Sequence, residues 1–471
     1  MVFSTLPKTP LVALALIQLL GFASEALATG VVIGASPNLG AATSSLRASP
    51  VVAQYWPAWS ATQSAQNFPW SSTDIAYYFV VATTSTGIQL PPGQSSQTVK
   101  SFVAEAKAHN VKAVFSVGGW NGGIYFSQLV GYAGSRASFA QSIQDFMDQY
   151  DFDGVDIDWE YPNHQGIGCN IISPMDSSNL LAFLHVLRTT VGASKLITAA
   201  VSPKGYCGSD GNALDDLSPF AKYLDYINLM AVSVPLHFFH LRHFLTPLLR
   251  SASMTLGNIR MSQQVLYLRL NLSFSGAWDS TTGPNSPLET CDAAGSVLDG
   301  VKVWTDRGFP APQILVGIPS YGISWTTTTS MLKTTYVDGF QSLLYQPVDK
   351  SNGTPQGDAN DVFSTAVDVC GNPGTGYTGH WTYKTLISGG ILSSDGSKGM
   401  GGFTRHFDSC TQTPFLYNPS TRDFISYDDG QSASSKASYV QANGLGGVFI
   451  YDSTGFTTDV LSSIRTTLEG Y

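Results

Sequence analysis

Eight short apolar segments separated by helical patterns constrain the fold of this chain more than any other feature. The segments are rich in Val, Ile, Tyr and Phe, which is typical of parallel strands covered by helices on their outer side. We expect strands at residues 51–56, 75–82, 113–118, 152–160, 196–201, 226–231, 314–319 and 447–451. Helical periodicity lies between them, at residues 98–109, 136–150, 180–188 and 294–307. This alternation predicts an α/β fold, a (β/α)8 TIM barrel. No Gly-x-Gly-x-x-Gly motif follows the first segment, so an open dinucleotide-binding sheet is disfavoured.

Two intervals are too long to be plain connections between strands. About 125 residues rich in Gly, Ser, Thr and Tyr separate the seventh and eighth strands, enough for a small separate domain. We therefore expect a barrel built from residues 51–325 and 441–471, with an inserted domain at 326–440. The second interval contains residues 232–272, which carry four Arg and three His but no Asp or Glu. His237, His240 and His243 lack a nearby carboxylate, so we predict no metal site there.

The first 50 residues are expected to lie outside the barrel. Residues 1–28 have the features of a signal peptide, namely Lys8, an apolar run from Leu11 to Ala23 and small residues up to Ala28. That run is too short to span a bilayer, and no later stretch is long and apolar enough. We therefore predict a secreted protein with a flexible segment at 29–50, no contact with a membrane and, by default, a monomeric state.

Charge and cysteine usage agree with an extracellular protein. The net charge is −9 and no run of Lys or Arg is present, which argues against binding to nucleic acid. Five cysteines fit a compartment in which disulfides persist. In the expected layout Cys169 can bridge to Cys207 and Cys370 to Cys410, which leaves Cys291 over. None has the spacing of a zinc site, and we expect no cofactor.

The strongest chemical signal is a row of carboxylates on the fourth strand. Alternate residues of a strand point to the same side, so Asp156, Asp158 and Glu160 share one face. In a barrel this face is the interior, and Glu160 would lie at the carboxyl-terminal rim, where such barrels hold their active sites. Three adjacent carboxylates cannot all ionise cheaply, so one pKa is expected to rise. A carboxyl group that stays protonated near neutral pH can act as a general acid.

The segment Asp153–Tyr161 resembles the DGxDxDWE signature of glycoside hydrolase family 18, the chitinases and their relatives, without a mismatch. Ser116–Trp120 is similar to the family's SxGG element, Tyr77–Phe79 to its second strand and Gly317–Gly322 to its seventh. Phe424–Asp429, with Ser434 and Lys436, resembles the late part of the family's α+β insertion domain.

The resemblance implies a chitinase with a substrate-assisted retaining mechanism. Glu160 would protonate the glycosidic oxygen, and the N-acetyl oxygen of the substrate would attack the anomeric carbon. Asp158 would orient the acetamido group, switching its hydrogen bond between Asp156 and Glu160. Chitin or chitooligosaccharides would be the partner. We expect the sugar-binding residues to be Tyr55, Trp56, Phe79, Gly118, Gly119, Trp120, Tyr161, Met230, Tyr321 and Tyr451, and Trp59 offers a further flat face.

The sequence departs from the family in two places. Tyr451 stands where the family usually has a Trp, and a tyrosine can still stack on a sugar. On the sixth strand Met230 and Ala231 are followed by Val232 and Ser233, so the family's Tyr and Asp are absent. That Tyr normally bonds the acetamido group in the transition state.

The departure on the sixth strand coincides with the start of the unusual segment 232–272, and a family-like loop resumes at Ser275–Asp279. We therefore hypothesise that the segment is translated intron, with a genuine insertion as the alternative. Two other functions stay open. One is an endo-β-N-acetylglucosaminidase, which the inserted domain disfavours, and the other is a chitin-binding lectin that has lost catalysis. The presence of Glu160 argues against the lectin, and the missing Tyr favours it.

Overall fold

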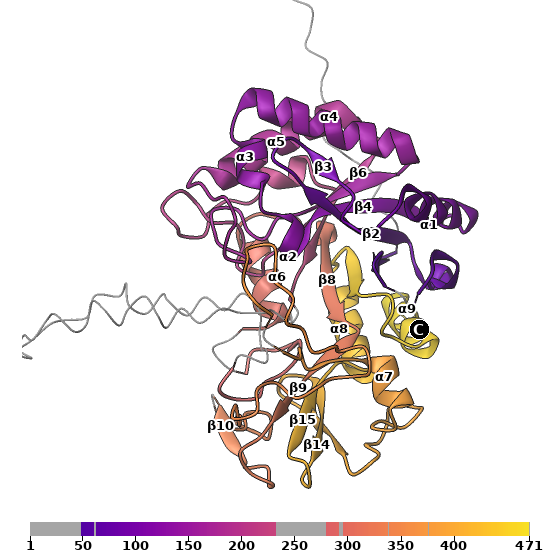
Figure 1. Ribbon diagram of the computed structural model, residues 1–471, viewed down its shortest axis with the longest axis vertical. Helices are drawn as coiled ribbons and strands as arrows, with labels where there is room; N and C mark the ends of the chain where they lie inside the picture. The colour runs from indigo at the N-terminus through magenta and orange to yellow at the C-terminus, as the bar shows by residue number, and fades with distance from the viewer. Residues whose placement is uncertain are drawn as a thin grey trace, which may run out of the picture. The chain divides into compact units, whose positions relative to one another are not determined.

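The structure, a computed structural model, describes residues 49–60, 63–231, 279–291, 295–337, 339–374 and 376–470 (Figure 1). The predicted signal peptide (1–28), most of the segment 29–50, and the segment 232–272 with its three histidines lie outside these residues. The loop Ser275–Asp279 lies outside them except for its last residue.

Among the described residues, eight parallel strands close into a barrel. Their order is β1-β16-β8-β7-β6-β5-β4-β2, and β1 pairs with β2 to complete the ring. The strands are β1 (Val51–Pro57), β2 (Ile75–Thr83), β4 (Lys112–Gly118), β5 (Gly154–Asp158), β6 (Leu196–Val201), β7 (Tyr226–Leu229), β8 (Ile314–Pro319) and β16 (Gly447–Tyr451). A short strand, β3 (Ile88–Gln89), pairs antiparallel with β2. The predicted (β/α)8 barrel is therefore confirmed, and β5 and β7 end earlier than predicted.

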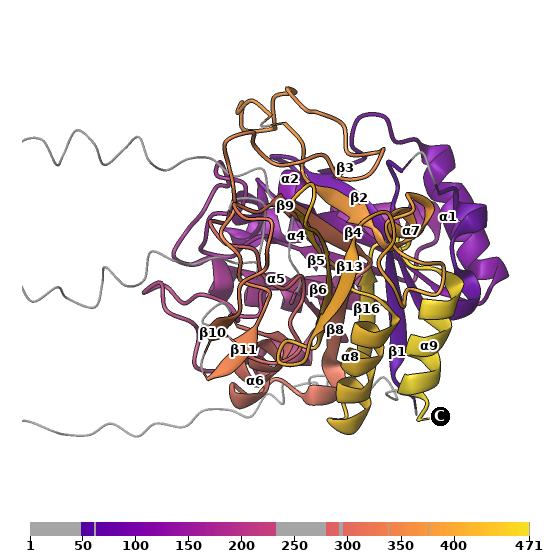
Figure 2. The same cartoon turned by 90° about the horizontal axis from the view of Figure 1, so that it is seen from below.

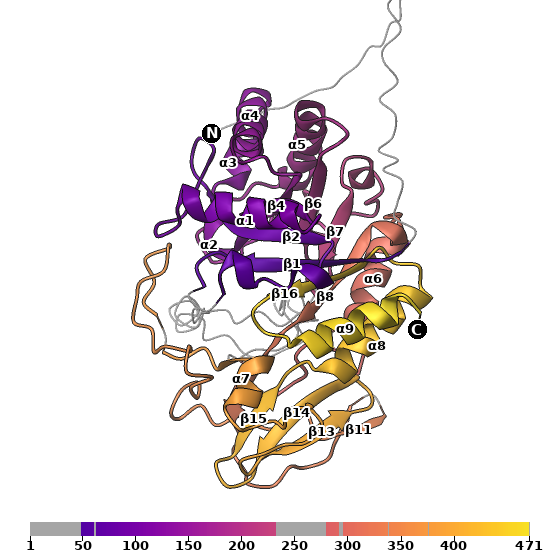
Figure 3. The same ribbon diagram turned by 90° about the vertical axis from the view of Figure 1, so that its right-hand side faces the viewer.

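Helices cover the outer side of the barrel strands. They are α1 (Ser96–Ala108), α3 (Phe126–Val130), α4 (Ala133–Tyr150), α5 (Asp176–Val191), α6 (Val297–Asp306), α8 (Gly430–Ala442) and α9 (Thr458–Leu468), while the one-turn helix α2 (Gly119–Gly122) directly follows the end of β4. Helices α4 and α5 run side by side, as Figure 3 shows, and so do α8 and α9 next to β16 (Figure 2). The helical periodicity predicted at 136–150 corresponds to α4, where Phe139, Ile143 and Met147 are inaccessible to solvent and Phe146 is partly buried.

A second, antiparallel sheet lies within the long interval before β16. Its order is β12-β9-β15-β14-β13, with β9 (Tyr321–Thr326), β12 (His380–Thr382), β13 (Thr404–Asp408), β14 (Thr413–Asn418) and β15 (Asp423–Ser426). A hairpin, β10 (Thr335–Val337) and β11 (Phe340–Ser342), and a helix, α7 (Tyr383–Ser388), complete this part. The sheet begins at Tyr321, before the predicted start of the inserted domain at 326, and α8 packs on α9 and β16. We call residues 321–426 the small domain.

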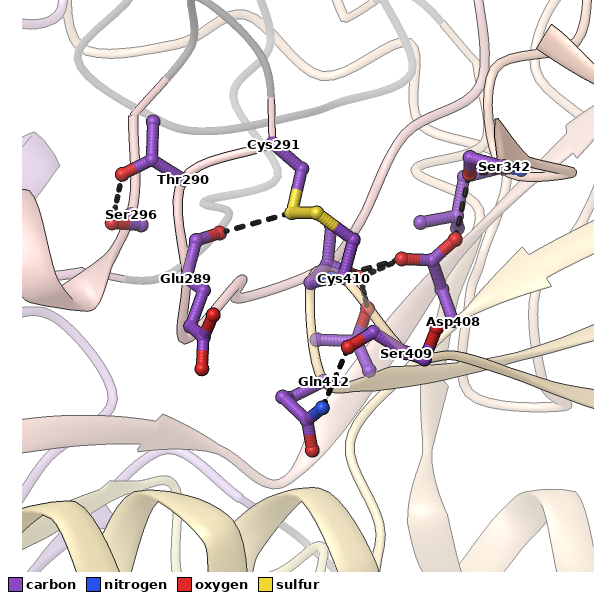
Figure 4. The surroundings of a disulfide bond; sticks show 12 residues. Glu289, Thr290, Cys291, Ser296, Ser342, Asp408, Ser409, Cys410 and Gln412 are labelled. Atoms are coloured by element: carbon purple, nitrogen blue, oxygen red, sulfur yellow. Dashed lines mark hydrogen bonds between the residues drawn. A yellow bond between two sulfur atoms is a disulfide. The ribbon is translucent and has the colours of Figure 1, made fainter. Parts of the chain in front are cut away.

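The predicted disulfide pairs are wrong. Cys169 is bonded to Cys370 and Cys291 to Cys410, while Cys207 is a free thiol. Figure 4 shows Cys291–Cys410 beside Asp408, which ends β13 and accepts a hydrogen bond of 2.7 Å from Ser342. Both bonds join cysteines more than a hundred residues apart, and sequence spacing cannot reveal that these loops meet.

Candidate active site

The carboxylate row lies inside the barrel, on and just beyond β5. Asp156, Asp158 and Glu160 are buried, with 0%, 4% and 6% of their surface exposed. The intervening residues point the other way, and Trp159 stacks on Phe126 of α3 with ring centroids 5.1 Å apart. The strand alternation inferred from the sequence therefore separates a polar inner face from an apolar outer one.

Asp156 is the most completely hydrogen-bonded member of the row. Its Oδ1 accepts from Thr198 at 2.6 Å and from Asn228 at 3.2 Å. Its Oδ2 accepts from Ser116 at 2.8 Å and from Tyr55 at 2.9 Å. Burial raises the pKa of Asp156, and these donors lower it because they stabilise the ionised form.

Asp158 differs from Asp156 because one of its oxygens is unsatisfied. Its Oδ1 is buried and has no hydrogen-bond partner. Burial raises the pKa of Asp158 well above its usual range, and the charges of Glu160 and Asp156 raise it further. A buried polar atom without a partner is costly, so Asp158 is poised to bond a ligand.

Glu160 is the carboxyl nearest the rim. Burial raises its pKa to about 7, and a hydrogen bond with the hydroxyl of Tyr161 opposes that rise. A group with this pKa is about half protonated at neutral pH, as a general acid requires.

Two glycines bring the end of β4 against Asp158. Gly118 has a φ of 109°, and a Cβ at this position would lie 2.2 Å from the carbonyl oxygen of Asp158. A Cβ on Gly119 would lie 3.5 Å from Asp158 Oδ2 and 3.1 Å from the ring of Phe79. Only glycine fits at 118, so the predicted Gly-Gly pair has a packing reason.

Aromatic side chains line the interior next to the carboxylates. Tyr451 of β16 lies 5.7 Å from Tyr55, 5.5 Å from Phe79 and 6.4 Å from Tyr321, measured between ring centroids. The charges of Asp158 and Glu160 contribute to the raised pKa of Tyr451, which therefore lies near both. Trp59 lies 5.5 Å from Phe79 and is 57% exposed, so its face is available to a ligand.

One predicted binding residue points away from the site. Trp56 is 3% exposed and stacks on Phe102 of α1 at 5.1 Å, in the core between strands and helices. It neighbours Tyr55 on β1, so the alternation that turns Tyr55 inward turns Trp56 outward. Met230 packs on the inner barrel cluster and is partly buried, as is Trp120 on α2.

The interior also contains polar residues that are not among the predicted catalytic or sugar-binding residues. Ser116 and Thr198 are the register partners of Asp156 on the two neighbouring strands. Asn228 of β7 donates to the hydroxyl of Tyr55 at 2.8 Å and accepts from Tyr77 at 3.4 Å. The available signal was a polar side chain inside an otherwise apolar run, at Ser116, Thr198 and Asn228.

Two negative findings apply to the described part of the chain. In residues 49–60, 63–231, 279–291, 295–337, 339–374 and 376–470, no group of three or more His, Cys, Asp or Glu could hold a metal ion. Over the same residues, every helix is too short or too polar to cross a membrane.

Comparison with known proteins agrees with this geometry. The model of the glycosyl hydrolases family 18 matches residues 51–455. A chitinase-like effector of Moniliophthora roreri is 33% identical over 86% of this chain and 90% of its own length. Chitinase A1 of Niallia circulans is 27% identical over 74% of this chain and 41% of its own length. Among solved structures, a chitinase of Rhizomucor miehei superposes with a TM-score of 0.70 at 26% identity, covering 88% of this chain and 99% of that one. The barrel, its carboxylate row and the match over 51–455 together establish that the chain belongs to the glycosyl hydrolases family 18.

Proposed function

We propose that this protein is a secreted chitinase that hydrolyses the β-1,4 bonds of N-acetylglucosamine polymers. The observation that carries the proposal is the pair formed by Glu160, with its pKa near 7, and Asp158, with its unpartnered buried oxygen. The first can deliver a proton, and the second can accept the N–H of an acetamido group. Similarity to chitinases over most of the chain supports the substrate class.

In the proposed mechanism the substrate supplies the nucleophile. Glu160 donates its proton to the glycosidic oxygen as the bond to the anomeric carbon breaks. The acetamido oxygen attacks that carbon from the opposite side and forms a cyclic oxazolinium ion, while Asp158 holds the amide N–H. The Glu160 carboxylate then takes a proton from water, and the water oxygen opens the ring with the original anomeric configuration.

Asp156 would act through Asp158 rather than on the sugar. Its two oxygens already accept four hydrogen bonds, so it stays in place beneath Asp158. Its charge raises the pKa of Asp158, which favours one shared proton in the row.

A chitin-binding protein that does not cleave is the second candidate. Val232 and Ser233 stand where the family has the Tyr and Asp of the sixth strand, which would weaken transition-state binding. The names of two similar proteins from Moniliophthora species, both chitinase-like effectors, also motivate this alternative. An endo-β-N-acetylglucosaminidase is a third candidate, and the presence of the small domain, which the resemblance to chitinases associates with polymeric substrates, disfavours it.

Substrate discrimination tests the proposed function. We expect the wild-type protein to cleave N-acetylglucosamine hexasaccharide and to leave glucosamine hexasaccharide and cellohexaose intact, because only the first carries the acetamido nucleophile. Products are measured by mass spectrometry, and binding of each sugar by calorimetry. Binding of the acetylated sugar without cleavage would support the lectin, and cleavage of cellohexaose would contradict the proposal.

The pH dependence follows from Glu160, which must be protonated to act as the acid. Because its pKa lies near 7, we expect kcat/KM to fall above pH 7, approaching tenfold for each further pH unit. Initial rates between pH 4 and pH 9 measure this decrease in kcat/KM. A kcat/KM that stays constant up to pH 9 would show that Glu160 is not the general acid.

The segment 232–272 differs from the rest of the chain in composition and in its match to the family pattern. We propose that it is translated intron, since it interrupts the family pattern and differs in charge from the rest of the chain. Removal of residues 232–272 joins Ala231 to Ser273, so the family's Tyr and Asp would also have to be restored after Ala231. Sequencing of the mature transcript tests this, and a message that contains these codons would refute it.

A further inference from the structure

The loop that follows Glu160 folds back onto the main chain of that residue. Asn170 is 6% exposed, and its Nδ2 donates to the carbonyl oxygen of Glu160 at 3.2 Å. Its Oδ1 accepts from the main-chain N–H of Gly166 at 3.2 Å. A Cβ on Gly166 would lie 2.1 Å from the same carbonyl oxygen, so the loop backbone is in direct contact with Glu160. One side chain therefore ties the loop to the main chain of the candidate acid.

Asn170 is itself fixed from within the loop. The side chain of Gln165 donates to the carbonyl oxygen of Asn170 at 2.9 Å and accepts from its N–H at 3.1 Å. These two bonds close a ring of six residues that ends at Asn170, next to Cys169.

The disulfide connects this loop to the small domain. Cys169 is bonded to Cys370, which lies 201 residues later in the chain. Cys370 lies at the tip of a loop that is closed by the bridge between Ser364 and Gly376. At the base of this loop Asp361 accepts from the N–H groups of Gly357 at 2.8 Å and Gly379 at 2.9 Å, next to β12. A continuous connection therefore runs from the small sheet through the disulfide and Asn170 to Glu160.

We propose that Asn170 is a positioning residue for Glu160, and that the Cys169–Cys370 disulfide holds Asn170 in place from the small domain. The bond from Asn170 to Glu160 goes to the main chain of Glu160, so Asn170 acts on the carboxyl only through that backbone. With the connection intact, the Glu160 carboxyl stays buried beside Asp158 of β5, the adjoining Tyr161 and Tyr451 of β16. Without it, the loop can leave the carbonyl and water can reach the carboxyl.

The consequence is a change in the titration of Glu160. Burial is the main cause of its raised pKa, so access of water lowers that pKa towards the ordinary range of a glutamate. A matching change in the pH dependence of kcat/KM rests on the proposed function, because it requires hydrolysis. The pKa of the Glu160 carboxyl can be measured whether or not the protein is an enzyme.

Carboxyl NMR tests the inference directly, because the chain has only five glutamates. Protein labelled with ¹³C at the glutamate carboxyl is titrated, and Glu160→Gln assigns the signal. In Asn170→Ala and in the double variant Cys169→Ser/Cys370→Ser, we expect the midpoint of Glu160 to fall by at least one pH unit. The alkaline limb of kcat/KM should move by the same amount. Both cysteines are replaced because a single remaining thiol would be free to pair with Cys207.

Two controls match these variants. Asn163→Gly removes a bond of the same loop, from Asn163 Nδ2 to the carbonyl of Gly208 at 2.6 Å, and glycine tolerates the φ of 56°. Cys291→Ser/Cys410→Ser removes the other disulfide. Neither control should move the titration of Glu160. If Asn170→Ala does not fold, Gln165→Ala loosens the loop without touching Glu160 and should give a smaller shift of the same sign.

An unchanged Glu160 midpoint in both the Asn170 and the double-cysteine variants would overturn the inference. A shift in Asn170→Ala alone would overturn the part assigned to the disulfide. A wild-type protein that cleaves no sugar but shows the shifts would refute the proposed function and leave the inference standing. Cleavage of the sugar by the wild-type protein, with no shift of the Glu160 midpoint in the variants, would support the proposed function and refute the role of Asn170.

Discussion

Glu160→Gln is expected to lower kcat on N-acetylglucosamine hexasaccharide about a thousandfold, with little change in the affinity for the sugar. Glutamine has the same shape but cannot donate a proton to the leaving oxygen, and general acid catalysis typically contributes a factor of 10² to 10⁴. The remaining rate reflects the acetamido nucleophile and Asp158. Initial rates and calorimetric binding, measured on the same preparations, give both quantities.

The stability of this variant separates lost chemistry from lost folding. A glutamate with a pKa raised to about 7 destabilises the folded state as the pH rises from its ordinary pKa to about 7. Glutamine does not ionise, so above pH 7 the variant should be more stable than the wild type, by up to about 3 kcal/mol. Glu105→Gln on α1 serves as the control and should change neither activity nor stability. Full activity in Glu160→Gln would remove Glu160 from the mechanism.

Asp156→Ala is expected to destabilise the barrel by about 3–5 kcal/mol and to abolish hydrolysis. The substitution leaves four buried donors, from Tyr55, Ser116, Thr198 and Asn228, without their acceptor. Each buried group that loses its partner costs about 1–3 kcal/mol. The bond between Asn228 and Tyr55 remains, and the desolvation of the carboxylate is relieved, so the total is less than the sum. Denaturant unfolding measures the loss.

Asp148→Ala is the matched control for that experiment. Asp148 is exposed on α4, and an exposed helix position normally changes stability by less than about 0.5 kcal/mol. If Asp156→Ala were as stable as Asp148→Ala, the hydrogen-bond network around Asp156 would not contribute to folding as its geometry indicates.

The fold was predictable because the barrel strands have a strong local signal. Parallel strands buried on both faces read as apolar runs, and their number and alternation with helices leave few architectures. The bounds of the small domain were not predictable in the same way. Its first strand, β9, follows β8 after a single residue, Ser320, so no linker marks the border.

The candidate site was predictable where one strand carries it. Asp156, Asp158 and Glu160 follow from a period of two along β5 and the two residues after it, whereas Thr198 and Asn228 join them only through the register of neighbouring strands. Trp56 illustrates the opposite error, because the same period turns it away from Tyr55 into the core. The disulfides depend on contacts between distant loops, and no local pattern encodes these.

The configuration of the first product tests the central claim most directly. Proton NMR spectra of the wild-type protein with N-acetylglucosamine hexasaccharide, recorded before mutarotation, distinguish the two anomers of the released sugar. Attack by the acetamido oxygen followed by water predicts the β-anomer. Release of the α-anomer, or a bound sugar that is never cleaved, would contradict substrate-assisted catalysis by Glu160 and Asp158.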